Sequence, residues 1–203
     1  GIRSIQLSMV QNVKEVPYGV SDFRTMVEQN IYYVDKTMYI PELEKQARYI
    51  IFIRPRRFGK SIFLGMLHAY YDCRTKSKFQ QWFGNLWIGK RPTPSQGRYQ
   101  VLHLDFSMVG GNIDNLEEKF NFYLGVQLNG FVRYYDEYYS DMIKQNVYAT
   151  QDAGGKLAII QNEAKMKDYP LYLIIDEYDN FTNTVLNEQG EKVYWAMTHA
   201  EGF

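Results

Sequence analysis

The residues best suited to chemistry in this chain are a glycine, a lysine and a serine in direct succession, Gly59-Lys60-Ser61. Triphosphate-binding loops use glycine for close backbone approach, lysine as a cation for the outer phosphates, and a Ser or Thr hydroxyl as a magnesium ligand. The complete Walker A pattern, GxxxxGK[ST], opens with a glycine, and Arg54 stands at that position here. By itself this segment is therefore compatible with either a nucleotide site or an ordinary helix start.

A second acidic motif follows an apolar run much later in the chain. Residues 171–175 are all apolar or aromatic, and Asp176-Glu177 come directly after them. A Walker B strand ends in this way: the aspartate holds Mg²⁺, and the glutamate orients and deprotonates the attacking water. The alternative interpretation is a strand that ends in two solvated acids. This alternative explains the acidic motif but not its occurrence together with Gly-Lys-Ser. Together the two motifs predict Lys60 and Glu177 as catalytic residues, with Ser61 and Asp176 as the metal ligands.

The loop itself carries an unusual number of arginines. Pro55 stiffens the turn at which Arg54 replaces glycine, and Arg56 follows it. One arginine touching phosphate, or reaching a neighbouring subunit's nucleotide, is the functional interpretation. Solvation, or pairing with acids such as Asp35 or Asp176, is the alternative that we favour for any single arginine. The residues expected to contact the nucleotide are Arg57, Phe58, Gly59, Lys60, Ser61 and Ile62.

The elements that must position these residues follow from the hydrophobic pattern. Short continuous apolar runs predict strands that are buried on both faces, and the segments between them have helical spacing. The predicted strands cover 48–53, 99–107 and 171–175, and the predicted helices cover 22–34, 38–44, 61–72, 113–139 and 155–167. Residues 113–139 are expected to form one long helix or a helical hairpin, with Gly125 and Gly130 as candidate breaks. Glycines and prolines predict a loop over 84–100. Strands separated by helices predict an α/β fold with a parallel sheet.

Composition excludes several classes of protein. The 203 residues are 45% hydrophobic, with 23 lysines plus arginines and 23 aspartates plus glutamates. The balanced charge gives no signal for a protein that coats nucleic acid or membrane. No window approaches the ~18 consecutive apolar residues of a membrane span, and no signal peptide is recognisable. With Cys73 as its single cysteine, the chain is expected to be a cytoplasmic, soluble domain.

Other candidate sites are weaker. The histidines, His68, His103 and His199, have no ligand spacing with Cys73, so no zinc site is predicted. Asp152 with Glu163 and Lys165 resembles a nuclease pattern, but a solvated helix face explains it better. The aromatic segment 131–142 is expected to be a half-buried helix face with hydroxyls reaching water, rather than a platform for bases.

Two further segments could belong to the nucleotide site. Asp35 and Lys36 precede the first predicted strand, where folds of this class often build an adenine pocket, and Tyr18, Phe23 and Tyr33 could form its walls. Core packing is an equally good explanation. Asp105 ends the second predicted strand and should reach the same sheet edge as the phosphate loop, since ligands collect at the carboxyl ends of parallel strands.

Three segments together carry a family resemblance: "YGVSDFRTMVEQNIYYVDKTMYIPELEK" (18–45), "RPRRFGKSIFLGMLHAYYD" (54–72) and "LIIDEYDN" (173–180). They resemble the predicted AAA-ATPase-like family of bacteria such as Bacteroides, in which arginine in place of the first glycine is the usual form. The resemblance implies a three-layer P-loop NTPase core with ATP and Mg²⁺ as cofactors. Relatives commonly continue into a C-terminal PD-(D/E)XK nuclease-like domain. Because the chain stops 27 residues after Asp176 (203 minus 176), we expect residues 1–203 to be the N-terminal portion of such a domain, truncated after the Walker B strand.

The sequence therefore predicts an N-terminal helical segment (1–47) and a partial nucleotide-binding core (48–203). The expected function is Mg²⁺-dependent ATP hydrolysis, with weak or absent turnover by the 203-residue chain alone. A nucleotide-binding or structural interaction module without turnover is the alternative, and a kinase is a weaker third option. The sequence leaves open whether the protein forms a homo-oligomer, and it indicates neither a membrane contact nor a direct nucleic-acid contact. The pathway, the work that hydrolysis drives, and any arginine finger are not determined by the residues.

Overall fold

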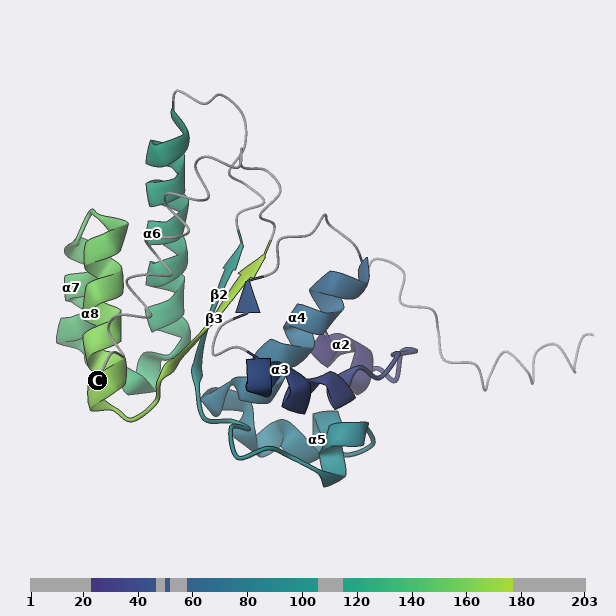
Figure 1. Ribbon diagram of the computed structural model, residues 1–203. Coiled ribbons are helices and arrows are strands. Elements are labelled where there is room, and N and C mark those ends of the chain that lie inside the picture. Colours follow the sequence, from purple (N-terminus) through teal and green to yellow (C-terminus); the bar gives the residue numbers. More distant parts are fainter. Residues whose placement is uncertain (1–22, 47–49, 52–57, 106–114, 177–203) are drawn as a thin grey trace, which may run out of the picture.

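A computed structural model describes residues 23–46, 50–51, 58–105 and 115–176 (Figure 1). For residues 46, 50, 51, 58–61, 116 and 176 it describes the main chain only. The strands are β1 (Ile50–Ile51), β2 (Gln100–Asp105) and β3 (Leu171–Asp176). The α-helices are α2 (Phe23–Glu28), α3 (Ile40–Gln46), α4 (Phe58–Tyr71), α5 (Phe79–Phe83), α6 (Leu116–Tyr134), α7 (Asp141–Ala149) and α8 (Ala153–Met166). Short 3-10 helices are η1 (Thr37–Tyr39), η2 (Cys73–Lys78), η3 (Trp87–Lys90) and η5 (Asp136–Tyr138).

The three strands form one parallel sheet in the order β1-β3-β2. Ile51 of β1 lies beside Ile175 of β3, and Asp105 of β2 lies beside Asp176 of β3. All three strands therefore end at the same edge of the sheet, as parallel strands with helical crossovers must. The predicted α/β class is confirmed. Of the first predicted strand, 48–53, only Ile50–Ile51 lies among the residues that the structure describes.

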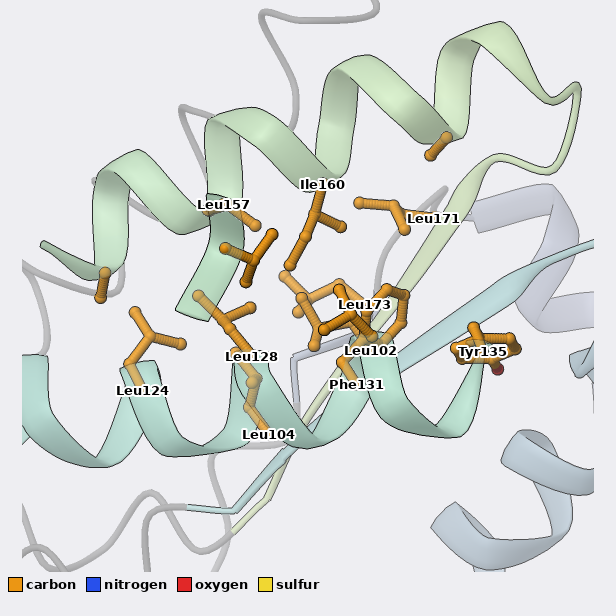
Figure 2. Close-up of a cluster of buried hydrophobic side chains, with 14 of the residues drawn as sticks. Leu102, Leu104, Leu124, Leu128, Phe131, Tyr135, Leu157, Ile160, Leu171 and Leu173 are labelled. Atoms are coloured by element: carbon orange, nitrogen blue, oxygen red, sulfur yellow. The ribbon is translucent and has the colours of Figure 1, made fainter. Parts of the chain in front are cut away.

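Helices pack on both faces of this sheet because alternate strand residues point to opposite sides. One face presents Leu102, Leu104 and Leu173 to the helices α6, α7 and α8. Figure 2 shows these leucines meeting Leu128 of α6 and Ile160 of α8. The other face presents residues of the same strands to α4 and α5, namely Val101, Tyr172 and Ile174. Strands covered on both faces are largely apolar, as β3 is, whereas β2 also carries the buried Gln100 and the half-buried His103.

The prediction that glycine breaks the long helix is wrong. Helix α6 runs without interruption from Leu116 to Tyr134, through both Gly125 and Gly130. A Cβ at Gly125 would lie 3.5 Å from the aliphatic chain of Lys156 in α8, which is ordinary van der Waals contact. Glycine costs a helix only about 1 kcal/mol, and the packing of the apolar face outweighs that cost.

The tyrosine-rich segment also differs from its prediction. Tyr135 and Tyr139 are buried, and their hydroxyls bind groups inside the protein instead of reaching water. The Tyr139 hydroxyl donates to Gln100 Oε1 (2.7 Å). Helix α7 was not predicted, although its N-cap is visible in the sequence as Ser140, which accepts a hydrogen bond from the Ile143 N–H. Helix η3 forms within the predicted loop.

A buried lysine joins the three helices on the α6 side of the sheet. The Lys156 side chain of α8 donates to the Val147 carbonyl at the end of α7 (2.7 Å) and to Asn129 Oδ1 of α6 (2.9 Å). Lys156 is only 5% exposed, and burial lowers the pKa of its ammonium group. The charge is favourable at this place because the carboxyl end of a helix carries partial negative charge.

Replacing Lys156 by methionine is expected to lower the free energy of unfolding by about 1–3 kcal/mol, because the buried Val147 carbonyl and the half-buried Asn129 amide lose their donor while the side-chain volume is kept. Urea unfolding followed by circular dichroism measures the change. Lys165→Met on the exposed face of the same helix is the matched control and should stay within about 0.5 kcal/mol. A Lys156→Met protein as stable as the wild type would show that the ammonium adds nothing to the joint between the helices.

Among the residues described, no helix is both long and apolar enough to cross a membrane.

Candidate functional site

The orientation of α4 decides where the Gly-Lys-Ser segment lies. Asp72, directly after α4, pairs with Tyr99 directly before β2, and the Cys73 N–H donates to the Tyr99 carbonyl (2.8 Å). The carboxyl end of α4 is thus at the edge where β2 begins. A helix of 14 residues spans about 21 Å, and a six-residue strand spans about 20 Å. Helix α4 packs along the sheet, so its first turn lies at the opposite edge, where the strands end (Figure 1).

The predicted site residues fall on this edge as far as the backbone describes them. Phe58, Gly59, Lys60 and Ser61 form the first turn of α4, and Asp176 is the last residue of β3. Their side chains lie outside the described part. Arg54, Arg56, Arg57 and Glu177 also fall outside the described residues. The catalytic, nucleotide and metal roles of these residues therefore remain predictions.

Ile62 has a described side chain, and it points into the protein. It is 7% exposed and packs against Met26 of α2 and Ile31. Any contact of Ile62 with a nucleotide would therefore involve its main chain. Its side chain instead anchors the start of α4 against the N-terminal helix, which fixes the direction in which the first turn points.

Asp105 is a second acid at this edge. It lies in register with Asp176, and its side chain is exposed. The side-chain amide of Gln127 in α6 forms two hydrogen bonds with the main chain of Asp105. It accepts from the Asp105 N–H (2.6 Å) and donates to the Asp105 carbonyl (2.9 Å). The edge thus combines the start of a helix, whose N–H groups and dipole favour an anion, with the carboxylate of Asp105, an oxygen donor suited to a hard cation.

The segment that was considered as an adenine pocket has a structural use instead. The Asp35 carboxylate accepts from the Thr37 N–H (2.8 Å), the Thr37 hydroxyl (2.7 Å) and the Trp87 N–H (2.7 Å). Thr37 is fully buried, and its hydroxyl accepts from the Ile88 N–H (3.2 Å). Phe23 is also fully buried. These contacts favour the core-packing alternative; Tyr18 lies outside the described part.

A buried polar network at the far end of α4 was missed by the sequence analysis. Asp72 is 1% exposed and accepts from the hydroxyls of Tyr134 (2.7 Å) and Tyr135 (2.9 Å). His68 Nε2 lies 3.5 Å from Asp72 Oδ2, and His68 Nδ1 lies 3.3 Å from His103 Nδ1. The spacing of His68 and Asp72, four residues apart on a predicted helix, was an available signal. No sequence signal indicated the contact of His68 with His103.

This network gives the stability an expected dependence on pH. Burial by itself raises the pKa of Asp72, but interactions with His68, Tyr134 and the main chain of Arg74 outweigh it, so the pKa lies below the ordinary 3.8. A carboxyl whose folded-state pKa is lower than its unfolded one stabilises the fold above the unfolded pKa, and this stabilisation is lost as the pH falls through the folded pKa.

We therefore expect the free energy of unfolding to decrease below pH about 4, and to decrease less in Asp72→Asn, which cannot titrate. Urea titrations at several pH values test this. Equal pH slopes in the two proteins would contradict the role of Asp72.

The other weak candidates have structural explanations. Asp152 caps α8 by accepting from the Gly155 N–H (3.1 Å), and Ala164 between Glu163 and Lys165 is buried. This favours the helix-face interpretation over a nuclease site. Within the described ranges, no three histidine, cysteine, aspartate or glutamate side chains come together so that they could hold a metal ion.

The fold and the placement of these segments define an α/β protein whose helix α4 carries Gly-Lys-Ser at the carboxyl edge of a parallel sheet. The chain belongs to the family described as Predicted AAA-ATPase, whose model matches residues 17–201. A relative described as an uncharacterized protein in the vnfD 5′ region of Azotobacter chroococcum mcd 1 is 44% identical over 55 residues. That match covers 27% of this chain and 11% of the relative. No solved structure matches the chain.

Proposed function

We propose that this protein binds ATP with Mg²⁺ in a three-layer P-loop NTPase core and hydrolyses it. The observation that carries the proposal is the shared edge: the turn containing Gly59, Lys60 and Ser61 starts α4 at the side where β3 ends with Asp176. Membership of the Predicted AAA-ATPase family supports nucleotide binding. The helix start attracts the phosphates, because its free N–H groups and its dipole both favour negative charge.

Each residue has a distinct task in this proposal. The main chain from Arg57 to Ile62 surrounds the phosphates, and the Lys60 ammonium stabilises the charge that builds up on the transferred phosphoryl group. Ser61 and Asp176 offer a hydroxyl and a carboxylate, which are oxygen donors of the kind that Mg²⁺ prefers. Bound Mg²⁺ supplies charge neutralisation at the phosphates. Glu177 directly follows the end of β3 and orients and deprotonates the attacking water.

Substitution of Glu177 by glutamine separates binding from turnover. ATP titration with and without Mg²⁺ should give affinities for Glu177→Gln and wild type within about threefold, because glutamine keeps the size of the side chain. Phosphate release by the full-length protein should fall by about 10²- to 10⁴-fold, the usual contribution of a general base.

Three results are informative. Absence of Mg²⁺-dependent ATP binding would overturn the proposal. Binding without any phosphate release by the full-length wild type would support a nucleotide-binding module without turnover. Unchanged phosphate release in Glu177→Gln would assign the base to another residue.

We further propose that the protein is cytoplasmic, that it forms a homo-oligomer, and that the full-length protein carries a C-terminal nuclease-like domain. The chain matches only 11% of the length of its curated relative, so further domains in a full-length protein are compatible with this comparison. Sedimentation of the full-length protein with and without ATP tests the oligomer. A single monomeric species under both conditions would exclude it.

A further inference from the structure

The segment 31–36, between α2 and η1, has a burial pattern of period two. Asn30 before it adopts a left-handed conformation (φ 53°), which turns the chain out of α2. Ile31, Tyr33 and Asp35 then face the protein, whereas Tyr32 (52% exposed) and Val34 (54% exposed) face outward. A period of two is the property of an extended chain. This segment therefore presents one side in the manner of a strand.

Its inward residues hold the segment in place. Ile31 packs against Ile62 of α4 in a buried cluster. The Tyr33 ring meets Phe23 edge-on, with 5.1 Å between ring centroids. Asp35 is bound by the main chain of Trp87 in η3. Because alternate residues are anchored in this way, the outward side is fixed before any partner arrives, and the entropy lost on binding is reduced.

Within the part of the protein that the structure describes, no hydrogen bond reaches the N–H or C=O groups of Tyr32, Tyr33 or Val34. Tyrosine and valine are favoured in strands, and outward residues of these types are unusual for a loop, which is commonly polar. A row of free main-chain groups beside β-forming side chains is the feature that an added strand recognises.

Exposed cations lie near the segment, whereas the nearby carboxylates of Glu28 and Asp35 accept hydrogen bonds from the Trp82 indole and the Trp87 main chain. Lys36 is exposed at its end, and the contact between Asp35 and Trp87 brings η3 against it, with exposed Lys90 and Arg91 following Trp87. The Arg91 guanidinium lies over the Trp87 ring, 5.0 Å from its centroid. Among the described residues, none of these three cations forms a salt bridge. A partner with acidic side chains is therefore favoured.

We propose that segment 31–36 is a docking edge for an extended, acidic peptide segment of a partner protein, which pairs with its main chain and places apolar residues against Tyr32 and Val34. Main-chain hydrogen bonds supply affinity in this mode of recognition, and alternate side chains supply specificity. The groups that would contact the peptide lie outside the proposed nucleotide site, so docking can be tested separately from ATP binding, although Ile31 behind them packs against Ile62.

A labelled eight-residue peptide of alternating glutamate and valine is the probe, with fluorescence anisotropy as the readout. We expect saturable binding that Val34→Asp weakens at least ~10-fold, since a carboxylate then meets the acidic peptide and the apolar contact is lost. Val126→Asp on α6, where Val126 is 48% exposed, is the matched control and should bind normally. A peptide with alternate amides N-methylated should bind at least ~10-fold more weakly, because it cannot donate to the edge.

Charge reversal and amide exchange make the test specific. The triple variant Lys36→Glu, Lys90→Glu, Arg91→Glu should prefer a lysine–valine peptide to the glutamate–valine peptide. Binding should also slow hydrogen exchange of the amides within 32–35. The proposal is overturned by an absence of saturable binding up to ~1 mM, or by equal affinity for the N-methylated peptide. Tighter binding of oligothymidine at the same segment would assign the surface to single-stranded nucleic acid. Self-association that Val34→Asp abolishes would assign it to a second copy of this chain.

Discussion

Replacement of Lys60 by alanine is expected to weaken ATP binding by about 30- to 5,000-fold, the largest effect on binding that we predict. The reason is the loss of a cation from an anion site: removing one partner of a desolvated charge pair costs about 2–5 kcal/mol. The main-chain N–H groups at the start of α4 remain, so residual binding should persist. Isothermal titration with Mg²⁺-ATP measures the change.

Two variants serve as controls for this prediction. Lys78→Ala, which removes an exposed lysine of η2, should bind ATP like the wild type. Lys60→Arg keeps the positive charge but replaces a compact ammonium group with a larger, planar guanidinium group, so we expect an ATP affinity between those of the wild type and Lys60→Ala. Thermal unfolding in the absence of ATP should show that the variants are folded. If Lys60→Ala binds ATP with wild-type affinity, the phosphate site lies elsewhere and the proposed function loses its basis.

Replacement of Asp72 by alanine is expected to destabilise the fold by about 3–5 kcal/mol, the range typical of removing one partner from a buried charged network. The side chain is 1% exposed and accepts from two tyrosine hydroxyls and the Arg74 N–H. Without it the buried Tyr135 hydroxyl and the half-buried Tyr134 hydroxyl lose their acceptor, and the Tyr135 hydroxyl also serves as the acceptor for the Val101 N–H of β2 (2.7 Å). The substitution therefore loosens α4, α6 and β2 at the same time.

Chemical denaturation with urea measures this loss. Asp136→Ala is the matched control, because Asp136 is exposed and pairs with Lys144 on the surface, where water screens the ion pair and little stability is lost. Asp72→Asn should fall between wild type and Asp72→Ala, because an amide oxygen can still accept one of the hydroxyls. Equal stabilities of Asp72→Ala and Asp136→Ala would refute the structural role of the network.

The positions of Lys60 and Asp72 on one helix allow the two predictions to be separated. Lys60 is in the first turn of α4, whereas Asp72 directly follows its last residue, about 18 Å further along the helix axis. Asp72→Ala should therefore lower stability more than it changes the affinity of the folded protein for ATP. Parallel measurements of unfolding and of ATP binding distinguish a site residue from a residue that supports the helix.

Several features of the fold could be predicted from the residues because they depend on local pattern. A continuous apolar run located β3, since a strand buried on both faces admits few polar side chains, and the mainly apolar segment 99–107 located β2. Helical spacing located α4 and α8, and alternation of strands with helices predicted the parallel sheet. The same argument placed Gly59, Lys60 and Asp176 at one edge before any coordinates, because parallel strands necessarily end together.

Tertiary packing decided what local pattern leaves open. The glycines of α6 indicated breaks, but the apolar face of that helix gains more from packing on β2 and α8 than glycine costs. The role of Asp35 was equally undetermined. Its partner Trp87 is 52 positions away, and no pattern in either segment announces the contact.

The sequence alone therefore determined the class of fold, the sheet edge at which a nucleotide site can form, and the residue types available there. Only the tertiary structure decided that His68 meets His103, 35 residues away, and that Tyr135 binds Asp72, 63 residues away. The physical reason is the range of the interactions. Periodicity and turn chemistry act between neighbours in the chain, whereas buried polar networks and an exposed strand-like edge depend on which elements the hydrophobic core brings together.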